Sequence, residues 1–305
     1  MQKTSARNIK HRIMANLKEI RTRIASVGST QQITSAMKMV SASKLRKSQN
    51  AITKLRPYSS KMTEIIQSLC DSEVLDMPYA RNNKPDTVLL VVLTSNKGLC
   101  SSFNANIIKS AMQRVRFWQE QDRYIKIDLL SYGKRGSDFF KKQTNINFIG
   151  GDDEIWDRLS FDNVSKIADF VMQTFTDKKY DRVEIIYNQF KNASTQILQC
   201  EQFLPIELKE AEEEKSSKKK DYIYEPNKSE ILSNIIPQSL KMQMYKCFLD
   251  SFASEHGARM TSMHKATDNA ESLLKELKLT YNKARQAAIT NEIIEICSGA
   301  EALNG

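Results

Sequence analysis

Apolar residues near the start of the chain recur at alternating steps of four and three positions. The series consists of Ile13, Leu17, Ile20, Ile24 and Val27. This seven-residue repeat is typical of helices that pack against a partner along a narrow seam. Beyond Gly28 the less regular continuation is Ile33, Met37 and Val40. Because Pro57 is the first proline, the pattern predicts one helix over residues 14–57.

The last third of the chain carries a second seam of the same kind. Its members are Met263, Ala266, Ala270, Leu273 and Leu277, at alternating steps of three and four. No proline follows Pro237, and Gly257 is an isolated glycine that a helix tolerates. The pattern therefore predicts a helix over residues 238–302, within a helical segment that covers 230–305.

A helix of this length does not fit inside a compact domain. At a rise of about 1.5 Å per residue it is about 98 Å long. A compact chain of this size has a radius of gyration near 19 Å and hence a diameter of about 50 Å. The helix must protrude, and its apolar stripe needs a companion. The matching stripes at the two chain ends therefore predict an antiparallel coiled coil.

The middle of the chain has a different pattern. Residues 87–95, with the sequence TVLLVVLTS, form an almost unbroken β-branched and apolar run that is typical of a buried strand. Further strands are predicted at 125–131, 183–188 and 195–203, and helices at 104–121, 134–142 and 163–177. Strands that alternate with helices predict a Rossmann-like α/β domain over residues 85–205. Residues 206–229 are predicted to form a charged linker.

Charge is distributed unevenly along the chain. The formal net charge is +10, but residues 1–61 contain 14 Lys and Arg against one acid, Glu19. The basic character therefore belongs to the N-terminal segment, which needs a polyanionic partner such as nucleic acid, a lipid surface or an acidic protein. No run of 18 apolar residues is present, so no membrane-spanning helix is predicted.

The residues that usually carry catalysis form no recognisable site. The glycines build neither a phosphate-binding loop nor a dinucleotide fingerprint. The five cysteines are scattered, with no CxxC pair, as in a reduced intracellular protein. His256 and His264 alone make a poor metal site, and Cys100 has no histidine nearby in the sequence. No enzyme site, cofactor or metal is therefore expected.

Two functions of different classes remain compatible with these patterns. The first is a coiled-coil rotor or scaffold whose basic helix docks on an acidic protein surface. The second is a nucleic-acid-binding protein that uses the same helix. The second lacks aromatic residues interleaved with the basic ones and any recognised nucleic-acid-binding motif. We therefore expect no nucleic-acid partner.

Four segments resemble the gamma subunit family of F-type rotary ATP synthases. Residues 17–47 read LKEIRTRIASVGSTQQITSAMKMVSASKLRK, and the C-terminal segment, residues 254–302, contains the run YNKARQAAIT at 281–290. Between them, residues 94–104 read TSNKGLCSSFN and residues 221–226 read DYIYEP. The resemblance covers nearly the whole chain from Met14 onward, and the run at 281–290 is its most specific part.

The resemblance implies an antiparallel two-helix coil with an α/β domain at its base, in agreement with the pattern. It also implies a rotor in the central stalk of a proton-translocating ATP synthase. The coil would turn inside a ring of alpha and beta subunits, while the base stands on the membrane c-ring beside the epsilon subunit. Rotation would force each beta subunit through open and closed states, and the chain itself would not catalyse a reaction.

The resemblance assigns contact residues by position. Arg285 and Gln286 match residues that hydrogen-bond acidic groups of the beta subunit, a task that suits a planar guanidinium. The further positions implied in the beta contact are Thr290, Arg259, Met37, Lys38, Leu99 and Cys100. The positions implied in the foot on the c-ring and epsilon are Tyr222, Tyr224 and Glu225.

The sequence departs from the family pattern in three places. Asn96 and Lys97 replace an acidic residue and an arginine. Ser101 and Ser102 replace two glycines, which puts a left-handed backbone turn there in doubt. Residues 1–13 lie upstream of the usual family start, and we expect a disordered basic extension. Because no transit peptide is recognisable, the cytoplasmic face of a bacterial inner membrane is the expected location, ahead of the mitochondrial inner membrane.

Overall fold

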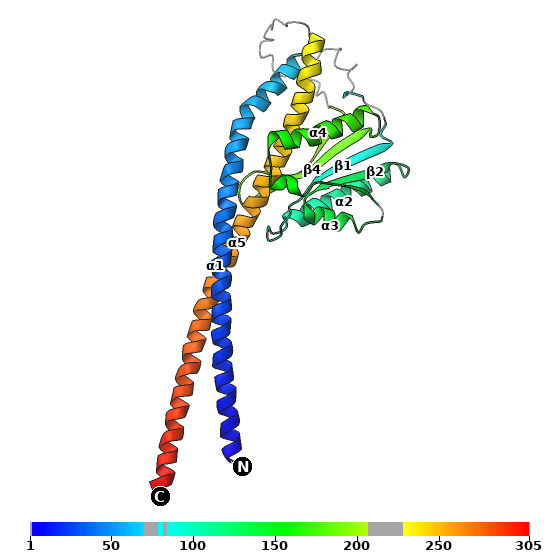
Figure 1. The fold of residues 1–305 in the computed structure, drawn as a ribbon. Helices are drawn as coiled ribbons and strands as arrows, with labels where there is room; N and C mark the ends of the chain where they lie inside the picture. The colour runs from blue at the N-terminus through cyan, green and yellow to red at the C-terminus, as the bar shows by residue number, and fades with distance from the viewer. Residues whose placement is uncertain (1, 70–78, 82–83, 145, 207–227, 305) are drawn as a thin grey trace. The chain divides into compact units, whose positions relative to one another are not determined.

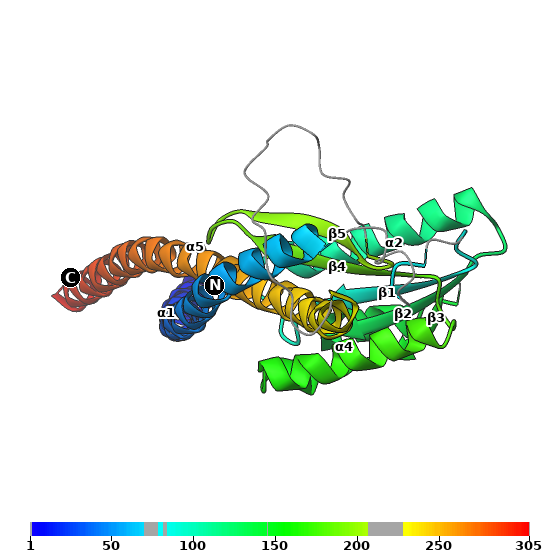
Figure 2. The ribbon, with the colours of Figure 1, turned by 90° about the horizontal axis from the view of Figure 1, so that it is seen from above.

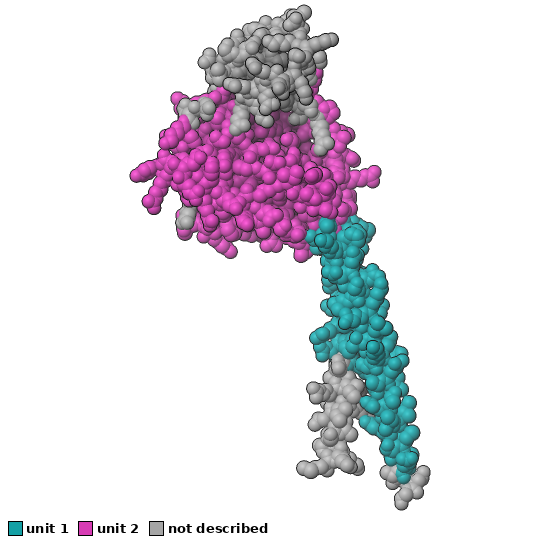
Figure 3. All heavy atoms as spheres, turned by 180° about the vertical axis from the view of Figure 1, so that it is seen from behind, with its two compact units in different colours: residues 1–40, 261–305 teal, residues 41–260 magenta. Residues whose placement is uncertain are grey.

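The chain divides into two compact units, which Figure 3 shows in different colours. The computed structural model describes residues 2–69, 79–81, 84–144, 146–206 and 228–304. Unit 1 consists of residues 1–40 and 261–305, and unit 2 consists of residues 41–260. Two long helices, α1 (Gln2–Leu69) and α5 (Lys228–Asn304), contribute residues to both units. Among the described helices, none is both long and apolar enough to cross a membrane.

Unit 1 is a pair of antiparallel helical segments, and the two chain termini lie at the same end of it (Figure 1). The predicted coiled coil is confirmed. Ile20 of α1 and Met263 and Ala270 of α5 are buried along the pair. On α5 the half-buried position after Ala270 is Leu274, whereas Leu273, which was predicted to face the partner helix, is 44% exposed. The seam of α5 therefore advances by four residues here, from Ala270 to Leu274, and not by the three residues that were predicted.

The seam of α1 beyond Val27 runs through polar residues. Its buried and half-buried positions keep the seven-residue repeat: Gln31, Thr34, Lys38, Ser41, Leu45, Ser48 and Ile52. The predicted continuation through Ile33 and Val40 is wrong, because these residues are 60% and 58% exposed. Helix geometry fixes the repeat, and short hydroxyl side chains fill the seam where the hydrophobic pattern breaks off.

Both long helices extend beyond their predicted limits. α1 begins at Gln2, so residues 2–13 continue the helix in place of the separate extension that we expected. This segment contains neither glycine nor proline to interrupt a helix. α1 also continues past Pro57, and α5 begins at Lys228, ahead of Pro237.

Packing on both sides of each proline explains why neither helix ends there. A proline inside a helix removes one hydrogen bond and costs about 3 kcal/mol. On α1, Ile52 and Met62 are buried before and after the proline, and on α5 the same holds for Ile236 and Leu240. Burial of such apolar side chains contributes about 1.5–3 kcal/mol each and offsets the cost.

Unit 2 is built on a five-stranded sheet with the strand order β3-β2-β1-β4-β5. The strands are β1 (Thr87–Leu93), β2 (Lys126–Tyr132), β3 (Asn147–Gly150), β4 (Arg182–Phe190) and β5 (Gln196–Leu204). All neighbours pair in parallel except β4 and β5, which are antiparallel. The predicted α/β domain is confirmed, and β3 is a strand that the pattern did not predict.

Helices cover both faces of the sheet (Figures 1 and 2). They are α2 (Phe103–Gln121), α3 (Lys134–Phe140) and α4 (Phe161–Thr176), with a short 3-10 turn, η2 (Glu154–Trp156). α2 and α3 pack on one face, whereas α4 and residues 232–248 of α5 pack on the other. Alternate residues of β1 enter the two cores, which explains its unbroken apolar sequence.

Candidate functional site

The carboxyl ends of β1 and β4 define the crevice where a doubly wound sheet usually binds its ligand, because the strand order reverses between them. In this chain α5 passes across both ends. The Ser251 hydroxyl donates a hydrogen bond to the Leu93 carbonyl at the end of β1, with a length of 3.4 Å. The chain's own helix therefore packs against this edge of the sheet.

Gly257 of α5 makes the close approach to the β4–β5 connection possible. A Cβ atom at this position would lie 3.2 Å from the Cα atom of Ala193 and 3.3 Å from its carbonyl oxygen. Both neighbours are backbone atoms, so a larger side chain would push the helix away from the connection. The glycine that the sequence pattern treated as an interruption thus has a packing role.

The loop between β1 and α2, residues 94–102, is tied internally to the first turn of α2. Asn104 accepts a hydrogen bond from the Ser95 backbone N–H at 2.9 Å, and its amide donates to the Ser95 hydroxyl at 2.8 Å. The same amide group lies 3.3 Å from the Cys100 sulfur. Cys100 is 2% exposed, and its neighbour Leu99 is 63% exposed.

Two residues of this loop have left-handed backbone conformations although neither is glycine. The φ angle is 61° at Leu99 and 55° at Ser101. The doubt about a left-handed turn at Ser101 is therefore resolved in favour of the turn. Such conformations cost about 1–2 kcal/mol for a residue with a Cβ atom and persist only where the surroundings hold them.

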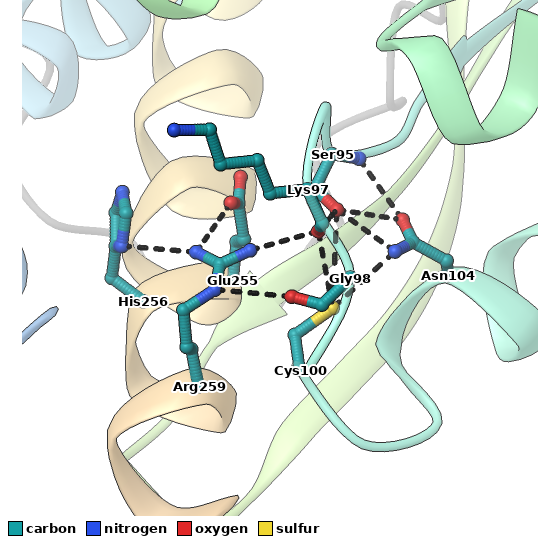
Figure 4. Close-up of polar contacts among 8 residues, drawn as sticks. All are labelled: Ser95, Lys97, Gly98, Cys100, Asn104, Glu255, His256 and Arg259. Carbon is teal, nitrogen blue, oxygen red and sulfur yellow. Dashed lines mark hydrogen bonds and ion pairs between the residues drawn. The ribbon is translucent and has the colours of Figure 1, made fainter. Parts of the chain in front are cut away.

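Arg259 of α5 binds the backbone of this loop (Figure 4). Its Nη2 donates to the Lys97 carbonyl at 2.9 Å, and its Nε donates to the Gly98 carbonyl at 3.2 Å. Its Nη1 lies 2.6 Å from a carboxylate oxygen of Glu255 and 3.3 Å from Nδ1 of His256. All three guanidinium nitrogens are thus engaged inside the chain, and Arg259 is 6% exposed.

Burial determines the charge states around Arg259. Burial, together with the charges of Arg259 and Lys44, lowers the pKa of His256 to about 3, so its ring is neutral and Nδ1 accepts the hydrogen bond. Burial raises the pKa of Glu255 although Arg259 opposes it, and burial also raises the pKa of the Cys100 thiol. A thiol with a raised pKa is a poor nucleophile.

Comparison with known proteins identifies the family. Residues 16–303 match a family model described as ATP synthase. The chain is 56% identical over 297 residues to an ATP synthase gamma chain of Christiangramia forsetii, and 55% identical over 295 residues to that of Flavobacterium johnsoniae. Each alignment covers 96% of this chain and 100% of the relative. The chain belongs to the ATP synthase gamma chain family.

Solved structures of the gamma family's assemblies share the fold. The Tetrahymena thermophila mitochondrial ATP synthase central stalk with its c-ring contains a chain that matches with a TM-score of 0.54 and 25% identity, covering 77% of this chain and 99% of that one. The Euglena gracilis mitochondrial ATP synthase contains a chain with a TM-score of 0.63 and 21% identity, covering 95% of each chain. The resemblance stated from the sequence is confirmed.

The residues that the gamma family resemblance places at the beta contact lie in different settings. Arg285, Gln286 and Thr290 are exposed on α5 in unit 1, while Met37 and Lys38 are half-buried on α1. In unit 2, Leu99 is exposed, but Arg259 and Cys100 are buried within the chain. The structure therefore brings Leu99, Cys100 and Arg259 together. Tyr222, Tyr224 and Glu225 lie outside the described residues.

The sequence did not predict the contacts that Glu255 and His256 make with Arg259. His256 was weighed only as a metal ligand with His264, which instead lies 3.3 Å from Asp268. In the described part of the chain, no group of three or more His, Cys, Asp and Glu residues could hold a metal ion. Glu255 and Arg259 are four positions apart on one helix face, a spacing that could have signalled their ion pair.

Proposed function

We propose that this chain is the non-catalytic rotor of a proton-translocating F-type ATP synthase. In this role it carries rotation between a membrane c-ring and the catalytic ring of alpha and beta subunits, with epsilon as a second subunit of the stalk. The observation that carries the proposal is the whole-length match to gamma chains, including 56% identity over 297 residues. The geometry of each unit supports one part of the task.

Unit 1 supports the role of a shaft. Two helices that pack along a seven-residue seam resist bending better than one helix, and their chain ends lie together at one end of the unit (Figure 1). Near the C-terminus of α5, every residue from 289 to 301 is exposed. Four large apolar residues are exposed there, Ile289, Ile293, Ile294 and Ile296. A surrounding ring of partner subunits would cover such a surface.

Unit 2 supports the non-catalytic part of the proposal. α5 lies across the carboxyl ends of β1 and β4, where a catalytic or nucleotide site would form in this type of sheet. Cys100, in the loop that follows β1, is buried and has a raised pKa, which suits a packing role. The chemistry of ATP synthesis and hydrolysis would then belong to the partner subunits.

We further propose three contacts with partner subunits. Arg285, Gln286 and Thr290 would bind acidic groups of a beta subunit through charge-assisted hydrogen bonds, each contributing roughly 1.5–3 kcal/mol. Met37 and Lys38, together with the exposed Leu99, would face the acidic lever of beta. The remaining contact is a foot on the c-ring and epsilon, formed by Tyr222, Tyr224 and Glu225.

The proposed location follows from these partners. The chain would be held at the cytoplasmic face of a bacterial inner membrane through its contacts with the c-ring. The relatives with 56% and 55% identity are bacterial proteins, which supports this location over the mitochondrial inner membrane.

Reconstitution with the alpha and beta subunits of the same organism tests the proposal. We expect a stoichiometric complex whose ATPase turnover rises on addition of this chain. Replacing Arg285 and Gln286 together by alanine should lower that turnover severalfold without preventing assembly. Lys283→Ala is the matched control, because it removes an exposed cation of the same helix. A chain that is folded by circular dichroism but neither binds nor stimulates the complex would contradict the proposal.

A further inference from the structure

Arg259 has a place in the fold that does not suit a direct contact with a partner. Its guanidinium is enclosed by Glu255, His256 and the backbone of the β1–α2 loop (Figure 4). To reach a partner, the side chain would have to release two carbonyl groups and a carboxylate that is itself buried. Such a release would leave a buried carboxylate without its cation, which is costly.

The bonds of Arg259 reach the loop immediately before its two strained residues. The accepting carbonyls belong to Lys97 and Gly98, and the left-handed residues are Leu99 and Ser101. On the far side of Leu99, the buried Cys100 is held by Asn104. The loop is therefore fixed on both sides of one exposed apolar residue, Leu99, which is 63% exposed.

Glu255 and His256 set the direction of the guanidinium. Both lie on the preceding turn of α5, at four and three positions before Arg259, and both bind the same nitrogen, Nη1. A neutral imidazole is the form that accepts a hydrogen bond from a guanidinium, which only donates. With Nη1 fixed in this way, Nη2 and Nε point at the two loop carbonyls.

We propose that Arg259, oriented by Glu255 and His256, is a positioning residue that holds the β1–α2 loop in the conformation that presents Leu99 to the beta subunit. The proposal rests on the proposed function for the identity of the partner. In this proposal Arg259 affects the beta subunit by positioning Leu99 and makes no contact with beta itself. Glu255 and His256 become part of the coupling machinery although neither reaches the surface.

The decisive experiment is a glycine rescue in the reconstituted complex of this chain with alpha and beta subunits. Arg259→Gln should lower the stimulated ATPase turnover at least about fivefold, because the strained loop loses its two bonds. Ser101→Gly, introduced into the Arg259→Gln chain, removes the cost of one left-handed residue and should recover at least half of the lost turnover. If the guanidinium contacted beta directly, Ser101→Gly would recover none of the lost turnover, and that result would overturn the proposal.

A second comparison tests whether Arg259 acts through Leu99 or independently of it. Leu99→Ala alone should lower the turnover, and in the Arg259→Gln chain it should cause little further loss, because the loop has already left its position. Losses that multiply in the double variant would contradict the proposal. Arg123→Gln, which removes an exposed cation of the same unit, is the control and should leave turnover unchanged.

The isolated chain provides a test that is independent of assembly. Amide exchange of residues 97–101 should become at least about tenfold faster in Arg259→Gln, with smaller changes in the strands of unit 2. If Arg259→Gln does not fold, Glu255→Gln, which keeps an acceptor oxygen but removes the charge, should show the same change to a lesser degree. Unchanged exchange in a folded variant would overturn the positioning role, whereas failure of the wild-type chain to assemble would count against the proposed function alone.

Discussion

The hydroxyl oxygens of Thr34 and Thr267 lie 2.9 Å apart and join α1 to α5 within unit 1. Each hydroxyl also lies within hydrogen-bonding distance of a carbonyl of its own helix, that of Gln31 at 3.0 Å or Met263 at 2.8 Å. Because a hydroxyl has a single proton, one threonine donates to its carbonyl and accepts the hydrogen bond that the other threonine donates across the seam. A polar pair at a seam position binds in only one axial alignment of the two helices. This contact therefore fixes the register of the coil, which a shaft needs in order to turn without sliding.

The register contact predicts a coupled effect of two conservative substitutions. Thr34→Val or Thr267→Val should each destabilise the coil by about 1 kcal/mol, because one cross-helix hydrogen bond is lost. The double variant should lose less than the sum, with a coupling of about 0.5–1 kcal/mol. Urea unfolding followed by circular dichroism measures these values. Thr280→Val is the control, since its exposed hydroxyl bonds only its own helix, at Glu276. Strict additivity would show that the two hydroxyls do not interact.

A buried carboxylate ties α2 to β4 in unit 2. Arg114 binds both oxygens of Glu184 at 2.6 Å, and Arg182 and the Trp118 indole N–H add bonds of 2.9 Å and 3.3 Å. Glu184→Gln leaves two guanidinium groups around a neutral side chain, so we expect a loss of about 3 kcal/mol. Glu120→Gln on the exposed side of α2 should change stability by less than about 0.5 kcal/mol. If Glu184→Gln and Glu120→Gln were equally stable, the buried carboxylate would not stabilise unit 2.

The Glu184 carboxylate should also contribute to unfolding of the chain at acid pH. Burial favours the neutral acid, but the hydrogen bonds and charge of Arg114, with Trp118 and Arg182, outweigh it and lower the pKa of Glu184. Its stabilisation is therefore fully present above the ordinary glutamate pKa of about 4.3 and is lost as pH falls through the lower folded value. The stability difference between wild type and Glu184→Gln should shrink over that range. A difference that stays constant with pH would contradict the assignment.

His256 should make the stability of the fold depend on pH in a range above that of Glu184. Its pKa is about 3 in the folded chain, against about 6.5 when unfolded. The unfolded state therefore binds an extra proton between these values, and stability falls as pH decreases below about 6.5, by up to 1.4 kcal/mol per pH unit. Glu255, whose pKa is raised, acts in the opposite direction, so the comparison needs His256→Gln and wild type side by side. The stability of His256→Gln should lack this slope with pH. Parallel curves of stability against pH for His256→Gln and wild type would contradict the assignment to His256.

The basic N-terminal segment predicts weak binding to nucleic acid. Residues 1–61 carry 14 basic residues against one acid, but in the proposed rotor these residues face an acidic protein surface. Fluorescence anisotropy with a labelled duplex should therefore show binding that disappears near about 0.2 M salt. Tight binding that persists at this salt concentration would favour the nucleic-acid alternative.

The sequence predicted the elements better than it predicted their contacts. Long apolar runs such as residues 87–93 define a buried strand on their own, and breaker-free repeats define long helices. β3 escaped prediction because Asn147–Gly150 has only four residues, none of them buried, and no apolar run. Thr34 and Ser41 escaped as seam residues because short hydroxyl side chains carry no hydrophobic signal.

The Arg259 network could not be predicted from a single sequence for a different reason. It joins the loop at Lys97 and Gly98 to a helix about 160 residues later, and no local pattern specifies which backbone carbonyls a guanidinium will meet. The family resemblance placed Arg259 in a surface contact, whereas its burial depends on how α5 crosses the sheet. All the partner contacts that the resemblance assigned stay predictions: those of Arg285, Gln286, Thr290, Arg259, Met37, Lys38, Leu99, Cys100, Tyr222, Tyr224 and Glu225.

The rotor function can be observed as rotation of the chain within a fixed ring of alpha and beta subunits. Tyr124 is 92% exposed in unit 2, so Tyr124→Cys gives an attachment point for a bead, with the exposed Cys200 and Cys297 replaced by serine. The same chain without Tyr124→Cys controls for attachment elsewhere. Added ATP should drive continuous rotation of the bead in one direction. An active complex in which the attached bead stays still would contradict the account.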